Sequence, residues 1–418
     1  MATIPIEFIF GAEFPTRRLI ARVSRVEQIG EGPRARYSYE FDAIDASVGR
    51  ENLDQAIAEP GIVAPFALLR IVTTPRRIAR IVGLEPTPGH WYLLEIAPRK
   101  QAPGPVVYHA QLGVDGYNVQ SKGALGSGDF LFSERGPEPA FRPLGAAVNA
   151  GIEAARALAH ICHFPAQAVA TQLEVSNLLN AIQKPTFVIV QDVGQASFCS
   201  FTNSAREPIL YFDVGWPLVF NGRTAPINFD LPRSSPPVIL SHWDFDHLFC
   251  FHKFRMRKNK WVTPVQNLGP GARKIAETLS NEGNLLGWPG GSCQLLWGEL
   301  CQGTGDPSES NDSGLVLQVE LASGRKVLLV GDAGYNSLPF STPPTPDFLV
   351  VTHHGAKFTG NVPIPIAHKS RCVVSVGNGN VYGHPNADAI KIHKRTGWTV
   401  DFTSGNWQQS RGSRELGP

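Results

Sequence analysis

The sequence has little of what marks membrane, disulfide-bonded or strongly charged proteins. Its 418 residues contain no apolar run near the roughly 20 residues of a membrane-spanning helix. The segment from Met1 to Phe10 lacks the basic start and long apolar stretch of a secretory signal, so the expected location is the cytoplasm, with no membrane partner. Six cysteines occur without a C-x-x-C pair, which argues against a zinc ribbon or a disulfide framework. The net charge of +2 leaves nucleic acid neither required nor excluded as a partner.

The length predicts about two to three domains. Residues 1–140 carry short apolar runs between Gly and Pro clusters, which predicts a β-rich domain whose function the residues do not indicate. A binding or scaffold role, with a protein partner, is the default expectation for it. Residues 141–184 have apolar residues at helical spacing broken at Pro165, which predicts a helical linker of two helices.

Residues 185–418 change to apolar runs between loops, which predicts a layered α/β domain whose strands are covered on both faces. The expected helices are Ala272 to Ser280 and Ala387 to Thr396. The expected strands are Phe187 to Val193, Ile209 to Val214, Val238 to Ser241, Leu315 to Val319, Val327 to Val330, Phe348 to Thr352 and Val373 to Val376.

One of these strands runs directly into a dense group of metal-competent side chains. After Val238-Ile-Leu-Ser come His242, Asp244, Asp246 and His247. Alternation along an extended strand end places the first three on one side, and His247 follows at the turn, so several ligands converge. Such a concentration of carboxylates and imidazoles is unfavourable unless a metal compensates it.

Three further strand ends repeat this pattern. Apolar runs lead to Asp332, to the tandem histidines His353 and His354, and to the segment Tyr382-Gly-His384-Pro. A single Gly-Asp or His-Pro is more often a turn or a loop. The repetition in this order indicates a metal site.

With these residues, the segment of about 186–405 resembles the metallo-β-lactamase superfamily, most specifically its ComEC-like branch. The matching motifs are Asp192-Val-Gly-Gln195, His242 to His247, Asn311-Asp312-Ser313, Gly331-Asp332, His353-His354-Gly355 and Tyr382-Gly383-His384-Pro385. The resemblance implies a metallo-β-lactamase αββα sandwich with two divalent metal ions. Two departures alter the loops beside the metals: the family's Gln-Gly-Asp is here Gln195-Ala196-Ser197, and its Gly-Gly is replaced by Leu248 to Phe251.

The resemblance also implies roles for the ligands. His242, Asp244 and one of the tandem histidines would hold one cation, Asp246 and His247 the other, and Asp332 would bridge them. Two cations about 3.5 to 4 Å apart activate a shared water and neutralise charge on the substrate. The oxygen-rich ligand set suits Zn²⁺ or Mn²⁺. Catalytic roles are expected for Asp246 and for His384, as a ligand or proton donor.

Two features bear on the substrate. Lys357, three residues after His354, is either an oxyanion or phosphate contact or an exposed lysine. A strip that contains Arg255, Arg257, Lys258 and Lys260 follows the first metal motif; it either binds phosphates or forms a solvated surface. Its place in the sequence favours a phosphodiester.

The sequence therefore predicts a metal-dependent hydrolase, with phosphodiesterase or nuclease activity on DNA, RNA or a nucleotide favoured. Hydrolysis of a small ester, lactone or thioester is the alternative, because fold alone does not separate the two. A third hypothesis is an interaction or effector protein with a regulated metal site.

Overall fold

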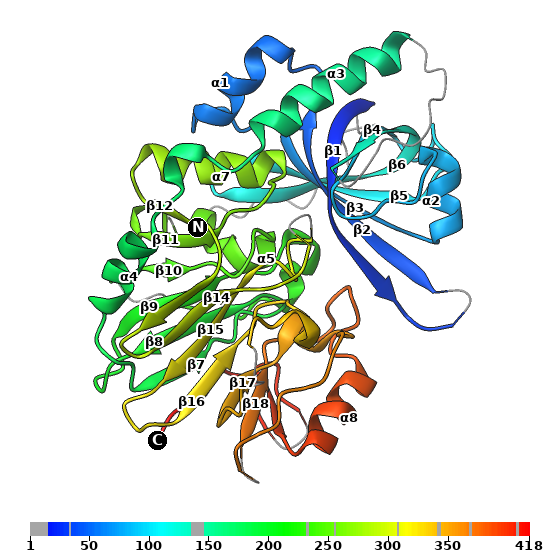
Figure 1. Cartoon of the computed structure of the whole chain (residues 1–418). Coiled ribbons are helices and arrows are strands. Elements are labelled where there is room, and N and C mark those ends of the chain that lie inside the picture. The colour runs from blue at the N-terminus through cyan, green and yellow to red at the C-terminus, as the bar shows by residue number, and fades with distance from the viewer. Residues whose placement is uncertain are drawn as a thin grey trace. The chain divides into compact units, whose positions relative to one another are not determined.

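In the computed structural model the chain forms two compact units (Figure 1). Unit 1 comprises residues 1–163 and 268–275, and unit 2 comprises residues 164–267 and 276–418. The structure describes residues 16–32, 35–134, 146–230, 234–254, 256–306, 309–340, 344–367, 370–406 and 409–418. Within these residues, no helix combines the length and apolarity needed to cross a lipid bilayer.

Unit 1 is built on a closed antiparallel barrel with the strand order β1-β2-β3-β5-β6-β4. Its strands are β1 (Arg17–Ile29), β2 (Arg36–Asp45), β3 (Phe66–Thr73), β4 (His90–Ala97), β5 (Val106–Gly113) and β6 (Gly116–Ser133). Alternate residues of β1, such as Leu19, Ala21 and Val23, point into an apolar core because successive side chains of a strand face opposite sides. The helices of this unit are α1 (Leu53–Ala58), α2 (Pro75–Val82) and α3 (Ala146–Ile161).

A buried carboxylate of the barrel caps the helix α7 (Pro270–Asn281), whose first residues belong to unit 1. The side chain of Asp42 accepts hydrogen bonds from the backbone N–H groups of Gly271 at 2.9 Å and Ala272 at 3.1 Å. A carboxylate at a helix N-terminus satisfies N–H groups that have no partner within the helix. Burial nevertheless raises the pKa of Asp42 to about 7, although these hydrogen bonds and the charge of Arg22 favour the ionised form.

Unit 2 contains two seven-stranded sheets. The first has the order β12-β11-β10-β9-β8-β7-β20 and the second the order β13-β14-β15-β16-β17-β18-β19. The strands of the first are β7 (Phe187–Val190), β8 (Phe198–Thr202), β9 (Pro208–Val214), β10 (Val238–Ile239), β11 (Trp261–Pro264), β12 (Leu285–Trp288) and β20 (Arg414–Leu416). Those of the second are β13 (Ser292–Leu295), β14 (Gly298–Gln302), β15 (Leu315–Glu320), β16 (Lys326–Leu329), β17 (Phe348–Val350), β18 (Arg371–Val374) and β19 (Thr399–Phe402).

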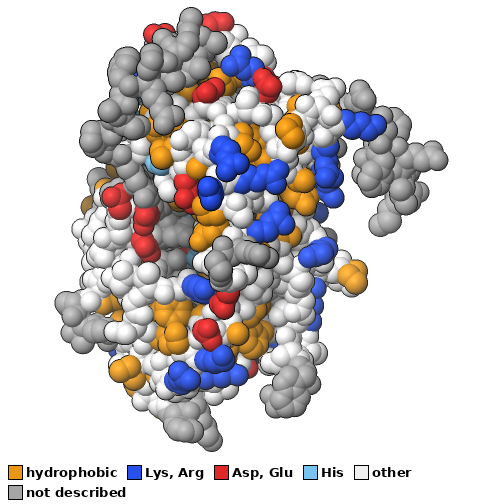
Figure 2. Space-filling view, turned by 90° about the vertical axis from the view of Figure 1, so that its right-hand side faces the viewer, with side chains coloured by type: hydrophobic (Ala, Val, Ile, Leu, Met, Phe, Trp, Pro, Cys, Tyr) orange, Lys and Arg blue, Asp and Glu red, His pale blue; other side chains and the backbone are white. Residues whose placement is uncertain are grey.

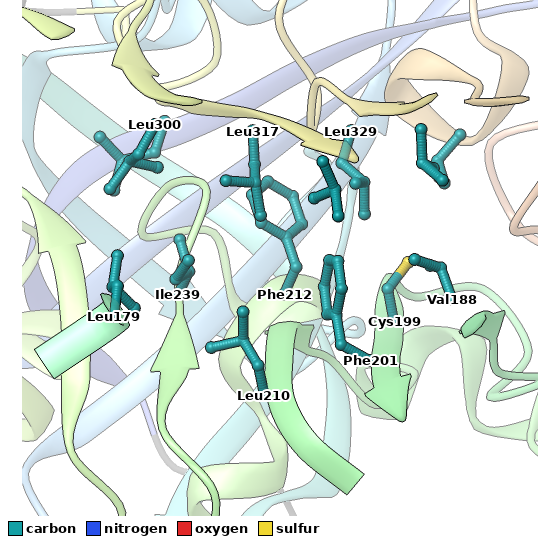
Figure 3. Close-up of a cluster of buried hydrophobic side chains, with 14 of the residues drawn as sticks. Leu179, Val188, Cys199, Phe201, Leu210, Phe212, Ile239, Leu300, Leu317 and Leu329 are labelled. Atoms are coloured by element: carbon teal, nitrogen blue, oxygen red, sulfur yellow. The ribbon is translucent and has the colours of Figure 1, made fainter. Parts of the chain in front are cut away.

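The two sheets enclose an apolar core (Figure 3). Phe201, Phe212 and Ile239 of the first sheet face Leu317 and Leu329 of the second. Apolar residues on both inner faces remove the largest area from water, which is the main driving force for stacking two sheets.

Helices lie on the outer faces of this sandwich. Ile390 of α8 (Ala387–Thr396) belongs to a second apolar cluster together with Leu328, Leu349 and Cys372, so α8 covers the outer face of the second sheet. The short helices α5 (Phe245–Leu248) and α6 (Cys250–Lys253) follow β10, and the ring of Phe251 lies 6.3 Å from that of Trp261 in β11. The structure thus confirms a strand-rich α/β fold.

The division into units differs from the predicted segments 1–140, 141–184 and 185–418. Helix α3 belongs to unit 1, whereas α4 (Gln172–Asn180) belongs to unit 2 and buries Val175 and Leu179 in the sandwich core. The two helices predicted as a linker are therefore parts of different units.

All six cysteines are unpaired and buried. Burial raises the pKa of the thiols of Cys162, Cys199 and Cys250 well above the usual value.

Candidate metal centre

The predicted metal ligands lie at the carboxyl ends of strands from both sheets of unit 2. Strand β10 is parallel to β9, and β16, β17 and β18 are parallel to one another, so their carboxyl ends point to the same edge. His242 follows β10, Asp332 follows β16, and the turn η7 (Thr352–Gly355) follows β17. The site residues that are buried are His242, Asp244, Asp246, His247, Asp332 and His354.

His242, His247 and Asp332 form a first group whose ligand atoms all lie within 4.8 Å of one another. His247 Nε2 is 3.1 Å from Asp332 Oδ1, and His242 Nε2 is 3.9 Å from Asp332 Oδ2. Three donors at this spacing can surround one cation.

Asp246, His247 and His354 form a second group with the same spacing. His354 Nε2 lies 3.4 Å from Asp246 Oδ2. His247 belongs to both groups, so the two candidate positions are adjacent.

Asp244 and His353 extend the first group. His242 Nε2 is 3.5 Å from Asp244 Oδ2, and His353 Nε2 is 3.5 Å from Asp332 Oδ2. Asp332 therefore lies close to three imidazoles, those of His242, His247 and His353.

The hydrogen bonds of the imidazoles fit metal ligation. His242 Nδ1 lies 3.0 Å from Ser241 Oγ, and His354 Nδ1 lies 2.8 Å from the backbone oxygen of Ser375. The Nε2 atoms of His242 and His354 are buried and have no hydrogen-bond partner among the described residues. An imidazole that bonds to protein through one nitrogen and presents the other is the usual arrangement of a metal ligand. With the nearby carboxylates, the donor set fits a divalent cation.

Asp213 of β9 is a member of this site that the sequence analysis missed. Its Oδ2 lies 2.8 Å from His247 Nδ1, and its Oδ1 accepts a hydrogen bond from the Ser241 N–H at 2.7 Å. Asp213 is fully buried and has a positive φ of 54°. The available signal was its position at the end of the apolar run Ile209-Leu-Tyr-Phe, the pattern that identified Asp332.

The carboxylates and imidazoles shift one another's pKa values. Burial disfavours protonation of His247, but Asp332 and Asp213 outweigh this effect and raise its pKa well above the usual value. Burial raises the pKa of Asp332, but the nearby imidazoles of His353 and His247 outweigh burial and hold this pKa well below its usual range. The site therefore favours positive charge beside Asp332, which a metal ion also supplies.

The turn that carries the tandem histidines is strained. His353 has φ 50° and ψ 46°, and His354 has φ 52° and ψ 26°. Left-handed backbone at residues with a Cβ costs roughly 1 to 2 kcal/mol each. The conformation brings His353 to Asp332 and His354 to Asp246, so strain accompanies ligand placement.

His384 lies beside the two groups and belongs to neither. Its ring centroid is 5.7 Å from that of His353, and its side chain is half-buried. Lys357 is exposed; the pKa of Asp388 in α8 is lowered mainly by its hydrogen bond and ion pair with Lys391 and to a smaller extent by the charge of Lys357. His384 is thus next to the cluster, whereas Lys357 faces solvent.

The described part of the basic strip, residues 256–260, directly precedes the amino end of β11. Val238 pairs with Trp261 in the parallel ladder of β10 and β11, so Lys260 precedes the amino end of β11. The other end of β11 is near the site, since Trp243 Nε1 donates to the Pro264 oxygen. Four residues of extended chain separate these ends by roughly 13 Å. The described part of the strip thus lies near the amino end of β11, whereas the candidate metal ligands lie near its carboxyl end.

The described residues of this strip have other contacts. Arg257, Lys258 and Lys260 are exposed. Arg257 Nε lies 3.6 Å from Glu282 Oε1, and Lys260 Nζ donates to the Gly283 oxygen at 2.6 Å. Arg255 lies outside the described residues.

The two departures from the family pattern occupy defined places. The Ser197 N–H donates to the backbone oxygen of Asp246 at 3.0 Å. The segment Leu248 to Phe251 is buried and spans the junction of α5 and α6, and Cys250 Sγ donates to the Gly215 oxygen at 3.2 Å. Ser197 thus supports the backbone of Asp246, and Cys250 links the junction of α5 and α6 to Gly215.

Comparison with known proteins adds little to this geometry. No protein-family model and no curated protein matches the chain. Among solved structures, a metallo-β-lactamase with a HARLDQ motif from Cronobacter sakazakii (Enterobacter sakazakii) is similar, at 16% sequence identity and a TM-score of 0.21. The similarity covers 42% of this chain and 69% of that chain. At this TM-score and sequence identity the similarity does not establish a shared function.

Proposed function

We propose that unit 2 is a metal-dependent hydrolase that binds two divalent cations. The observation that carries this proposal is the pair of adjacent His/Asp groups that share His247. Two neighbouring positions with buried imidazole and carboxylate donors are what a binuclear centre requires.

The contacts favour one distribution of ligands. His242, Asp244 and His353 would hold one cation, and Asp246, His247 and His354 the other. Asp332, close to imidazoles of both sets, would bridge them. Three carboxylates make the donor set rich in oxygen, which suits Zn²⁺ or Mn²⁺.

When bound, the two cations would lower the pKa of a shared water and neutralise charge on the substrate. The residues of the chain do the rest. Asp213 orients His247 through Nδ1, and the Ser375 oxygen orients His354 in the same way. His384 is half-buried next to His353, where it can donate a proton to a leaving oxygen.

A phosphodiester is the substrate we favour, since its charge matches a binuclear cationic centre. The described part of the basic strip lies near the amino end of β11, away from the carboxyl ends that carry the candidate ligands. This position favours a nucleotide or another short substrate over a long polymer. The face of the molecule in Figure 2 has Lys and Arg side chains interspersed with acidic and apolar ones. A small ester, lactone or thioester is the second candidate, because a site without a phosphate-binding strip is compatible with a neutral substrate.

Elemental analysis and a substrate panel test the proposal. The full chain, purified without chelator, is expected to carry about two metal ions, and Asp332→Asn should carry fewer than one. Asp388→Asn, on the exposed side of α8, is the matched control and should leave the metal content unchanged.

The panel comprises single-stranded DNA, duplex DNA, RNA, bis(p-nitrophenyl) phosphate, a p-nitrophenyl ester, a lactone and a thioester, each with zinc, manganese or magnesium. We expect the wild type to hydrolyse the phosphodiesters and the Asp246→Ala variant to have lost this activity. Turnover of the ester, lactone or thioester alone would transfer the assignment to the second candidate. A wild-type chain that binds less than one ion would overturn the metal centre itself.

A further inference from the structure

The loop 377–384, which ends at His384, is organised around one buried side chain, Asn380. The Oδ1 atom of Asn380 accepts hydrogen bonds from the N–H groups of Tyr382 at 3.1 Å, Gly383 at 2.9 Å and His384 at 3.0 Å. Its amide Nδ2 donates to the backbone oxygens of Gly377 at 2.9 Å and His384 at 2.7 Å. One side chain thus fixes both backbone groups of His384.

Residues outside the loop also hold its backbone and the segment that follows it. The Val381 N–H donates to Asn221 Oδ1 at 2.8 Å, and Arg223 Nε donates to the Gly379 oxygen at 2.9 Å. On the far side of His384, the Asn386 N–H donates to the oxygen of Gly355 at 2.8 Å, the residue that follows the tandem histidines. The backbone of His384 is therefore positioned against the turn that carries His353.

Asn380 contributes no group to the two candidate metal positions, and its side chain is buried with both amide atoms bonded to this loop. These five hydrogen bonds require one oxygen that accepts and one NH₂ group that donates within the same side chain. The carboxamide of asparagine supplies both. Its role is therefore to hold another residue.

We propose that Asn380 is a positioning residue that fixes His384 for proton donation to the leaving group. This inference rests on the proposed function of the site. In the reaction, the oxygen of water bonds to phosphorus, the bond to the leaving oxygen breaks, and that oxygen takes a proton from His384. A proton of the attacking water then restores His384.

Leaving-group dependence separates positioning of a proton donor from a general loss of structure. In bis(p-nitrophenyl) phosphate the leaving group departs as a stable anion, whereas in diphenyl phosphate it needs protonation. His384→Gln is expected to lower kcat for diphenyl phosphate by about 100-fold and that for the activated substrate by less than about threefold. Asn380→Ala should show the same pattern, with a loss of about tenfold on diphenyl phosphate.

Two further variants complete the test. Asn378 lies in the same loop but donates to the oxygen of Ser404, outside it, so Asn378→Ala is the matched control and should match the wild type. Asn380→Asp keeps an acceptor for the three N–H groups and should retain more activity than Asn380→Ala. The double variant Asn380→Ala/His384→Gln should be no slower than His384→Gln alone, because both changes remove one function. Equal losses on both substrates, or multiplicative losses in the double variant, would overturn the proposal.

Amide hydrogen exchange tests the positioning apart from catalysis. Exchange at residues 382–384 should be about tenfold faster in Asn380→Ala than in the wild type and unchanged in Asn378→Ala. Unchanged exchange in Asn380→Ala would reject the positioning role, whatever the activity. A wild type that hydrolyses neither substrate, with the exchange difference present, would reject the phosphodiesterase assignment and the proton-donor role of His384, leaving only the structural hold on the loop.

Discussion

Asp213 determines how His247 presents its Nε2 atom to both candidate metal positions. A carboxylate behind a ligating imidazole fixes the ring and its tautomer, and loss of such a partner typically weakens metal binding by about 10- to 100-fold. We expect Asp213→Asn to lower metal affinity by this factor, because the amide has a single oxygen and cannot accept hydrogen bonds from both the Ser241 N–H and His247 Nδ1. Metal titration measures this change.

Asp401→Asn provides the control, since Asp401 pairs with Arg371 away from the site. An affinity of Asp213→Asn equal to that of Asp401→Asn would contradict the role of Asp213.

Asp42 makes the stability of unit 1 depend on pH. Its pKa is raised from 3.8 to about 7 in the folded chain, chiefly by burial. The folded state therefore binds the proton more tightly, so the resulting stability is complete below about pH 4 and is lost as the pH rises through 7. Asp42→Asn cannot titrate, and its free energy of unfolding relative to the wild type should increase by up to about 4 kcal/mol between pH 4 and pH 7.

Urea unfolding at several pH values gives this difference. The exposed Asp54 of α1 supplies the control Asp54→Asn. Parallel pH curves for Asp42→Asn and the wild type would show that Asp42 does not titrate in this range.

At the scale of elements, strand direction decides which residues meet. The carboxyl ends of β10, β16 and β17 converge, whereas the strip after α6 returns to the amino end of β11. Replacement of Arg257, Lys258 and Lys260 by Ser should therefore leave the hydrolysis of nucleic acid and its salt dependence unchanged. A kinetic comparison over a range of salt concentrations checks this, and a flatter salt dependence in the variant would show that the strip contacts phosphates.

Strand direction also explains how much the sequence could predict. Strands that are continuous apolar runs, such as β9 and β17, were predicted close to their observed bounds, and so were α7 and α8. Strands such as β13 and β14 were missed because polar and small residues interrupt them and cross-strand pairing defines them. The candidate ligands were predicted from clusters that follow apolar runs, whereas the position of the basic strip depends on where the chain turns, which no local sequence pattern indicates.

At the scale of the whole molecule, unit 2 begins before the predicted boundary. Leu179 of α4 lies in the sandwich core and its oxygen accepts a hydrogen bond from Trp297 Nε1 at 3.1 Å. A chain that starts at Thr186 loses this helix, whereas one that starts at Phe164 keeps it. The shorter chain should be less stable by about 5 kcal/mol, the sum of two buried apolar side chains and one hydrogen bond.

Urea unfolding followed by circular dichroism compares the two chains. Both contain every candidate ligand, so the folded fraction of each should bind the same number of ions. Equal unfolding midpoints would show that α4 adds nothing to the sandwich.

The buried thiols give the chain a practical property. Because all six cysteines are enclosed and burial raises the pKa of several of their thiols, a thiol-reactive dye or spin label should modify the native protein slowly. A single cysteine introduced on an exposed turn would then be the preferred attachment point. The natural chain is therefore a suitable background for distance measurements between units 1 and 2 in solution.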